Sequence, residues 1–107
     1  MDRVTVQDKR RHPRVPINLP ITCEAPNQRP VVGILVDVSM GGAFVSSEAA
    51  FSFGTEITIV GDLPGARGAR LPAVVRWSKP GGFGVQFGLL GARETHALAG
   101  VVRSSKS

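Results

Sequence analysis

The sequence is poor in cysteine, tyrosine and acidic residues, and it has no long apolar run. Cys23 is the single cysteine, which excludes an internal disulfide and a zinc site built from several cysteines. No apolar stretch is long enough to cross a membrane, and no leader-like segment opens the chain. We therefore expect a cytoplasmic protein that is not inserted in a membrane.

Signals for catalysis are also scarce. His12 and His96 are far apart in the sequence and share no metal-ligand spacing. The sequence has no Gly-x-Ser-x-Gly motif and no Walker-type or dinucleotide-binding glycine pattern. Cys23 falls on the apolar face of an expected strand, where an inert core thiol is more common than a nucleophile. We expect a protein that is not an enzyme and that holds no metal or cofactor.

The composition that remains is that of one basic globular domain. The chain has 107 residues, of which 42% are hydrophobic and 20% charged, and its formal net charge is +5. Such a charge predicts an anionic partner, and a nucleotide, a nucleic acid and a membrane surface all satisfy it.

Short alternating runs of apolar and polar residues dominate the pattern. Together with 13 glycines and 8 prolines, they predict strands joined by tight turns, at 17–25, 31–38, 43–46, 56–59, 71–77 and 83–88. Pro20 on the outer face of the first strand suggests an edge position, and residues 61–68 are expected to form a loop. One helix is predicted over residues 92–103, with Ala97, Leu98, Val101 and Val102 as its apolar stripe.

Six antiparallel strands and one closing C-terminal helix predict an all-β fold, a small six-stranded barrel. It occupies residues 9–103, between a flexible arm at 1–8 and a tail at 104–107. We expect its core to contain Ile17, Leu19, Ile21, Val32, Ile34, Val36, Ile57, Ile59, Val75, Phe83, Val85 and Phe87. Trp77 shares the phase of Leu71, Ala73 and Val75, so it is either core or a cap whose outer side is open for stacking on a base.

A basic run precedes the first strand. Lys9-Arg10-Arg11-His12-Pro13-Arg14 holds four permanent cations and no carboxylate. Arginine grips phosphate or the O6/N7 edge of guanine with paired hydrogen bonds, and Pro13 disfavours a helix here. The run is therefore either an extended anion clamp or a solvated arm.

A second unusual stretch, Asp37-Val38-Ser39-Met40-Gly41-Gly42, ends the second strand. Asp37 and Ser39 project the same way from a regular strand, and either can bind a ligand or bond to nearby backbone N–H groups. Gly41 and Gly42 allow a sharp bend and leave the backbone approachable. This stretch is therefore a candidate ligand-binding turn with polar side chains.

Together, the two motifs resemble the signature of the PilZ domain family, Arg-x-x-x-Arg followed by Asp-x-Ser-x-x-Gly. Arg10 and Arg14 match the first part, and Asp37, Ser39 and Gly42 match the second. The resemblance covers about residues 8–103. It implies a β-barrel that binds the bacterial second messenger cyclic di-GMP, like the stand-alone members that act through another protein.

The resemblance also implies roles for the site residues. Arg10 and Arg14 would bind guanine or phosphate, Asp37 would accept hydrogen bonds from a guanine's Watson–Crick edge, and Ser39 would add a hydroxyl contact. Gly41 and Gly42 would allow close approach of the backbone. In this family a cation just before the first motif arginine accompanies two intercalated nucleotides, and an apolar residue accompanies one. Lys9 holds that position, so together with Arg11 it predicts two molecules of cyclic di-GMP per chain.

Two alternatives stay open. A small basic barrel can bind single-stranded nucleic acid, and a barrel of this fold can serve as an interaction scaffold without a nucleotide. Five phenylalanines, mostly in core phase, one tryptophan and no tyrosine offer no obvious stacking platform, which disfavours nucleic acid. The downstream protein partner is not identifiable from the sequence.

Overall fold

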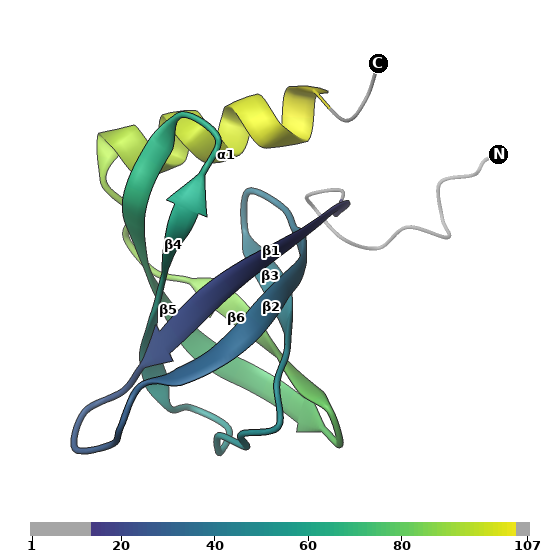
Figure 1. Ribbon diagram of the computed structural model, residues 1–107, viewed down its shortest axis with the longest axis vertical. Coiled ribbons are helices and arrows are strands. Elements are labelled where there is room, and N and C mark those ends of the chain that lie inside the picture. Colours follow the sequence, from purple (N-terminus) through teal and green to yellow (C-terminus); the bar gives the residue numbers. More distant parts are fainter. Residues whose placement is uncertain (1–13, 105–107) are drawn as a thin grey trace, which may run out of the picture.

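The computed structural model describes residues 14–104, which form a closed barrel of six antiparallel strands with one helix across an end (Figure 1). Around the barrel the order is β1-β2-β3-β6-β5-β4. The elements are β1 (Val15–Glu24), β2 (Val31–Val38), β3 (Gly42–Ser46), β4 (Glu56–Leu63), β5 (Ala66–Lys79), β6 (Gly82–Phe87) and α1 (Ala92–Ser104). The predicted fold class is confirmed. The predicted arm at 1–8, the basic residues Lys9, Arg10 and Arg11, and most of the predicted tail lie outside the described residues.

The loop predicted for residues 61–68 is wrong, because β4 and β5 form a long hairpin there. β4 continues to Leu63, β5 begins at Ala66, and the turn between them contains Gly65 with a φ of +88°. Gly61 lies inside β4. A side chain would not fit at this position, because a Cβ would lie 2.6 Å from Cγ2 of Ile21. Glycine at this position serves a close approach of two strands and is not a turn signal.

The edge position predicted for Pro20 is also wrong, since a closed barrel has no edge strand. The pairing nevertheless shows why a proline fits. β1 pairs with β2 along most of its length, but with β4 only from Thr22 to Glu24. Pro20 therefore lies in the half of β1 that has a paired neighbour on one side only, where fewer backbone donors are needed.

The core prediction is confirmed for Ile21, Ile57, Ile59, Val75, Phe83 and Val85, which are all buried. Ile17, Leu19 and Phe87 are half-buried and pack against this core. The face predicted for β2 is wrong: Val32 and Ile34 are 79% and 38% exposed, and Val36 is half-buried. Both faces of β2 are apolar, so its alternation does not show which one points inward. Leu35 and Val38 are the buried side chains of this strand.

Helix α1 packs through the predicted stripe, with Ala97 and Leu98 buried and Val101 and Val102 half-buried. The backbone N–H of Arg70 in β5 donates to Oε2 of Glu94 in the first helical turn, at 3.3 Å. This hydrogen bond is the largest cause that lowers the pKa of Glu94. No helix within residues 14–104 is long and apolar enough to span a membrane.

Candidate functional site

The central feature of the site is a row of paired residues that crosses four strands on the outside of the barrel. Asp37 of β2 pairs with Phe44 of β3, Phe44 pairs with Gly84 of β6, and Gly84 pairs with Trp77 of β5. Residues of one row lie side by side although they are up to 47 positions apart. The row therefore brings the polar motif and the single tryptophan onto one surface.

Two β-bulges put the ends of this row on the surface. The register shifts between Leu35 and Asp37 in the β2–β3 pairing and between Val75 and Trp77 in the β5–β6 pairing. An extra residue in one strand reverses the alternation beyond it. Leu35 and Val75 are fully buried, whereas the side chain of Asp37 is 26% exposed and Trp77 is 42% exposed. The two bulges thus turn Asp37 and Trp77 outward.

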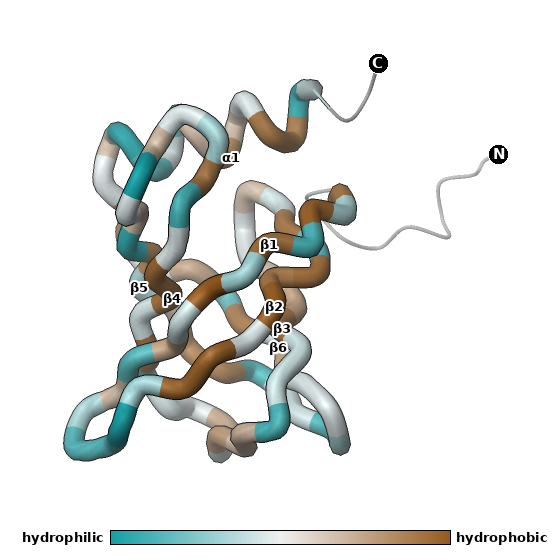
Figure 2. Tube along the Cα trace, in the orientation of Figure 1, coloured by the Kyte–Doolittle hydropathy of each residue, from teal (hydrophilic) through white to brown (hydrophobic). Residues whose placement is uncertain are grey.

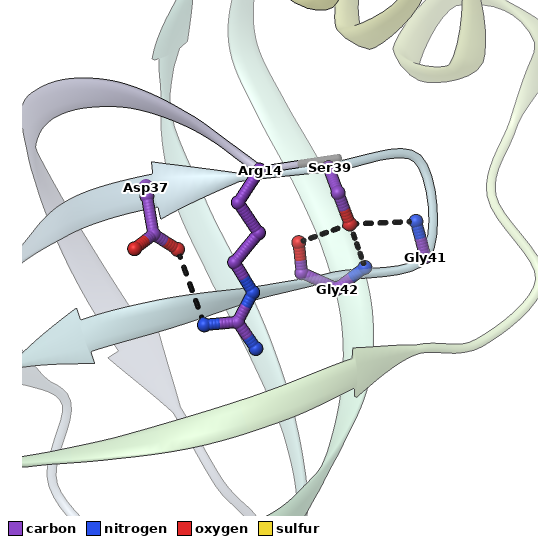
Figure 3. A network of polar contacts seen from close by, with 5 residues as sticks. All are labelled: Arg14, Asp37, Ser39, Gly41 and Gly42. Atoms are coloured by element: carbon purple, nitrogen blue, oxygen red, sulfur yellow. Dashed lines mark hydrogen bonds and ion pairs between the residues drawn. The ribbon is translucent and has the colours of Figure 1, made fainter. Parts of the chain in front are cut away.

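Arg14 forms an ion pair with Asp37 at one end of the row (Figure 3). Its Nη1 lies 3.5 Å from Oδ1 of Asp37, and both side chains are 26% exposed. The pair forms because Arg14 directly precedes β1, where Val15 pairs with Val38 and Pro16 with Asp37. Oδ1 of Asp37 is buried and has no hydrogen-bond donor among the described residues. This oxygen can accept a hydrogen bond from a ligand once its contact with Arg14 opens.

Ser39, Gly41 and Gly42 build the turn between β2 and β3. Ser39 is buried, and its Oγ accepts hydrogen bonds from Gly41 N at 3.1 Å and Gly42 N at 3.2 Å. The hydroxyl also donates to Gly42 O at 3.3 Å, and all three bonds stay inside the turn (Figure 3). A Cβ at Gly42 would overlap the carbonyl oxygen of Val85 in β6. The structure thus gives these residues a part in shaping the turn, and a ligand contact from them stays a prediction.

A stacked aromatic pair forms the other end of the row. The rings of Phe44 and Trp77 are 5.4 Å apart between centroids and inclined by 14°. Gly82 and Gly84 of β6 leave the space that this requires, because a Cβ at Gly82 would overlap the Phe44 ring and one at Gly84 would overlap the indole. We call Phe44 and Trp77 the aromatic platform. Trp77 is 42% exposed and lies on the outside of the barrel, so it is not a core residue, and its stacking on a base stays a prediction.

Lys79 adds a positive charge to the aromatic platform. Its Nζ lies 5.3 Å from the ring centroid of Phe44 and 5.9 Å from that of Trp77, both within cation–π range. Phe44 and Lys79 were not among the predicted site residues, and the stacked pair is a platform that the aromatic composition did not make obvious. The two glycines around Phe83 were the available signal, since glycines spaced by two in a strand leave one face open to a large neighbour.

The rest of the described chain offers no evident nucleophile or metal site. Cys23 is fully buried, and burial raises the pKa of its thiol to about 11, which fits the predicted inert core residue. Within residues 14–104 no three histidine, cysteine or acidic side chains come together as metal ligands. The structure thus brings together Arg14, Asp37 and Trp77 of the predicted site, with the turn of Ser39, Gly41 and Gly42 beside them. Lys9, Arg10 and Arg11 lie outside the described residues.

Comparisons with known proteins agree with this architecture. The family model described as PilZ domain matches residues 8–103. The PilZ domain of CeSA from a cellulose-synthesizing bacterium is similar in structure, with 24% identity, a TM-score of 0.69 and coverage of 89% of this chain and 99% of that one. The PilZ domain of YcgR from Escherichia coli, solved with c-di-GMP, gives 16% identity, a TM-score of 0.70 and 92% coverage of both chains.

A third structure, the inhibitor of motility MotI/DgrA of Bacillus subtilis, has a TM-score of 0.72 and 17% identity. The match covers 92% of this chain but 52% of MotI, so the chain spans about half the length of that protein. No curated protein sequence matches the chain.

Proposed function

Because the chain belongs to the PilZ domain family, matched over residues 8–103, we propose that it is a receptor for cyclic di-GMP that signals to a partner protein. The observation that carries the proposal is the row on the outer face of the barrel. It places a motif ion pair, Arg14 with Asp37, at one end and a stacked aromatic pair at the other. The PilZ domain of YcgR, which was solved with c-di-GMP, has the same fold and supports this ligand.

The polar end of the row suits a guanine. Asp37 holds a buried carboxylate oxygen without a hydrogen-bond donor among the described residues, and the N1–H and N2–H₂ groups of guanine are donors. Arg14 is a rigid fork of N–H donors that matches phosphate or the O6/N7 edge. In the structure these two side chains contact each other, so a nucleotide that binds both must open their ion pair. This exchange of partners is the conformational change that we propose for signalling.

The aromatic platform suits the second part of such a ligand. Trp77 is 42% exposed, so a purine can stack on its open side, and Lys79 stands close enough to the rings to reach a phosphate beside the base. The proposed ligand-binding set is Lys9, Arg10, Arg11, Arg14, Asp37, Ser39, Gly41, Gly42 and Trp77, to which the structure adds Phe44 and Lys79 as candidates.

We also propose that two molecules of cyclic di-GMP bind per chain. A stacked pair brings four phosphate charges together, and their repulsion must be offset by nearby cations. Lys9, Arg10, Arg11 and Arg14 supply four. In this proposal the protein is a cytoplasmic bacterial receptor without catalytic activity of its own.

Titration calorimetry with cyclic di-GMP tests the proposal directly. We expect saturable heat with a dissociation constant in the micromolar range or below, and a weaker affinity as salt rises, because partly exposed charges are screened. An absence of binding at ligand concentrations of several hundred micromolar would reject the receptor function.

The aromatic platform supports one alternative function, the binding of single-stranded nucleic acid. A basic barrel with an exposed stacked pair and a lysine beside it has the two elements used to bind single-stranded nucleic acid, a π-face and a cation. Calorimetry with a single-stranded oligonucleotide separates the two functions. We expect cyclic di-GMP to bind at least a hundredfold more tightly than the oligonucleotide, and the reverse order would favour the nucleic-acid function.

A further inference from the structure

An exposed apolar area lies on the outer face of β1, β2 and β4, away from the motif residues. Val32 pairs with Thr22, Thr22 pairs with Val60, and Pro20 pairs with Ile34, so these five side chains form two neighbouring rows. We call them the β1–β2 surface. Figure 2 shows hydrophobic stretches along β1 and β2. Val32, the second residue of β2, is 79% exposed, and Ile34 is 38% exposed.

The β1–β2 surface is hollowed. A depression of about 680 Å³ lies over it, lined by Pro20, Thr22, Val32, Ile34 and Val60, with Asp62 at one side. A second hollow adjoins it at Val32 and is lined by Glu48. β1 and β4 are paired only from Thr22 to Glu24, and the regular pairing of these strands does not continue beside the depression. A concave apolar area of this kind fits an inserted side chain better than a flat strand face does.

The charged residues that line these hollows are acidic, although the whole chain is basic. The chain carries a net charge of +5, yet the two acidic residues Asp62 and Glu48 line the hollows, and no lysine or arginine among the described residues does so. Arg67 precedes Gly68 in the chain but is not part of the lining. Opposite charges across an interface favour association and select the partner.

This charge pattern also decides which occupant fits. A two-fold dimer through the same area would bring the acidic side chains of both copies together, which is unfavourable. An anionic membrane surface would be repelled in the same way. A partner segment with aliphatic side chains for the hollows and lysine or arginine beside Asp62 and Glu48 satisfies both features. We propose that the β1–β2 surface is the docking site for such an apolar and basic segment of a partner protein.

The β1–β2 surface adjoins the candidate nucleotide site without sharing its residues. Ile34 pairs with Ser46, Ser46 with Gly82, and Gly82 with Lys79, the lysine beside the aromatic platform. A bound partner segment and a bound ligand would therefore occupy neighbouring rows of one sheet face. The docking proposal stands on its own geometry and is tested without nucleotide, so failure of the receptor function would leave it intact.

The test is a selection from a library of random displayed peptides on the full chain, with prior removal of peptides that bind Val32→Thr/Ile34→Thr. Threonine keeps the branched shape and the strand preference while replacing an apolar contact. Leu89→Thr is the matched control, because Leu89 is 94% exposed and lies outside the β1–β2 surface. Circular dichroism and thermal unfolding show that all variants are folded.

We expect selected peptides rich in aliphatic residues flanked by lysine or arginine. Their dissociation constant should rise at least tenfold in the double threonine variant, at least threefold in Glu48→Gln/Asp62→Asn, and less than twofold in Leu89→Thr. Four outcomes would overturn the proposal. They are selection of acidic peptides, no peptide that distinguishes the double variant, vesicle binding that depends on Val32 and Ile34, and a wild-type dimer in light scattering that this double variant separates.

Discussion

The indole of Trp77 lies over Gly84, and it stacks on Phe44 only because Gly84 has no side chain. Both neighbours come from adjacent strands, since Gly84 pairs with Phe44 on one side and with Trp77 on the other. The aromatic platform therefore depends on a residue that contributes no contact surface of its own.

Gly84→Ala should disrupt the aromatic platform. The new methyl group would overlap the indole, so the ring must swing outward, and we expect a red-shifted emission of Trp77, the single tryptophan. The dissociation constant for cyclic di-GMP should rise about tenfold or more, a loss of about 1.4 kcal/mol. Gly88→Ala is the control, because a Cβ there makes ordinary contacts at 3.7 Å and beyond. Equal affinity in both variants would remove Trp77 from the ligand site.

Arg14→Ala and Asp37→Ala should each weaken binding of cyclic di-GMP by about 1–3 kcal/mol, the range for a paired contact to a base. Their side chains contact each other at 3.5 Å, so the losses in the double variant should not add. Calorimetry measures all three affinities. Arg29→Ala removes an exposed cation from the turn between β1 and β2 and should have little effect. Wild-type affinity in either single variant would refute the assignment of that residue.

Ser39→Ala should lower the free energy of unfolding by about 1–3 kcal/mol, because the N–H groups of Gly41 and Gly42 lose a buried acceptor. Urea unfolding followed by circular dichroism measures the change. Ser52→Ala, at an exposed loop position, should leave the stability within about 0.5 kcal/mol. If both variants unfold at the same urea concentration, the turn does not depend on the Ser39 hydroxyl.

Lys9→Leu should reduce the number of bound cyclic di-GMP molecules from two to one while binding is kept. The reason is electrostatic, since one cation fewer is available to offset the phosphates of a stacked pair. Calorimetry at chain concentrations well above the dissociation constant gives the stoichiometry. Lys106→Leu removes the same charge from the predicted tail and should leave the stoichiometry at two. A wild-type value of one would contradict the prediction.

The buried thiol of Cys23 predicts a loss of stability at alkaline pH. Its pKa is raised from 9.0 to about 11, so the folded state keeps the proton after the unfolded state has released it. The stability is therefore complete below pH 9 and decreases as the pH rises through 11, by about 3 kcal/mol at most. The difference between wild type and Cys23→Ala isolates this contribution from that of other groups. Parallel pH curves for the two proteins would refute it.

The strands and the helix could be predicted from the sequence because their signal is local. The alternation in β1 and around Phe83 in β6 gives both the element and its inward face. In β2 the alternation fails, because apolar residues occupy both faces and only the pairing with its neighbours selects Leu35 as the inner one. The positions of strands in a sequence are thus easier to predict than the face of each strand that points into the core.

The site was predicted only in part because it depends on register. Asp37 and Arg14 belong to recognisable motifs, but the ion pair between them follows from the pairing of β1 with β2. Phe44 and Trp77 meet because one bulge in β5 and two glycines in β6 align three strands, β3, β6 and β5. A bulge has no clear local pattern, so an outward Trp77 could not be distinguished from a core residue in the sequence.

The short pairing between β1 and β4 has a mechanical consequence. β1 pairs with β4 only from Thr22 to Glu24, so the first half of β1 is paired with β2 alone. Arg14 stands at the start of that half, and a ligand that grips Arg14 and Asp37 would fasten β1 to β2 from outside. Binding would then add a link between β1 and β2 in the half of β1 that has no other paired neighbour, so that occupancy of the site and the stability of this half of the strand become one equilibrium.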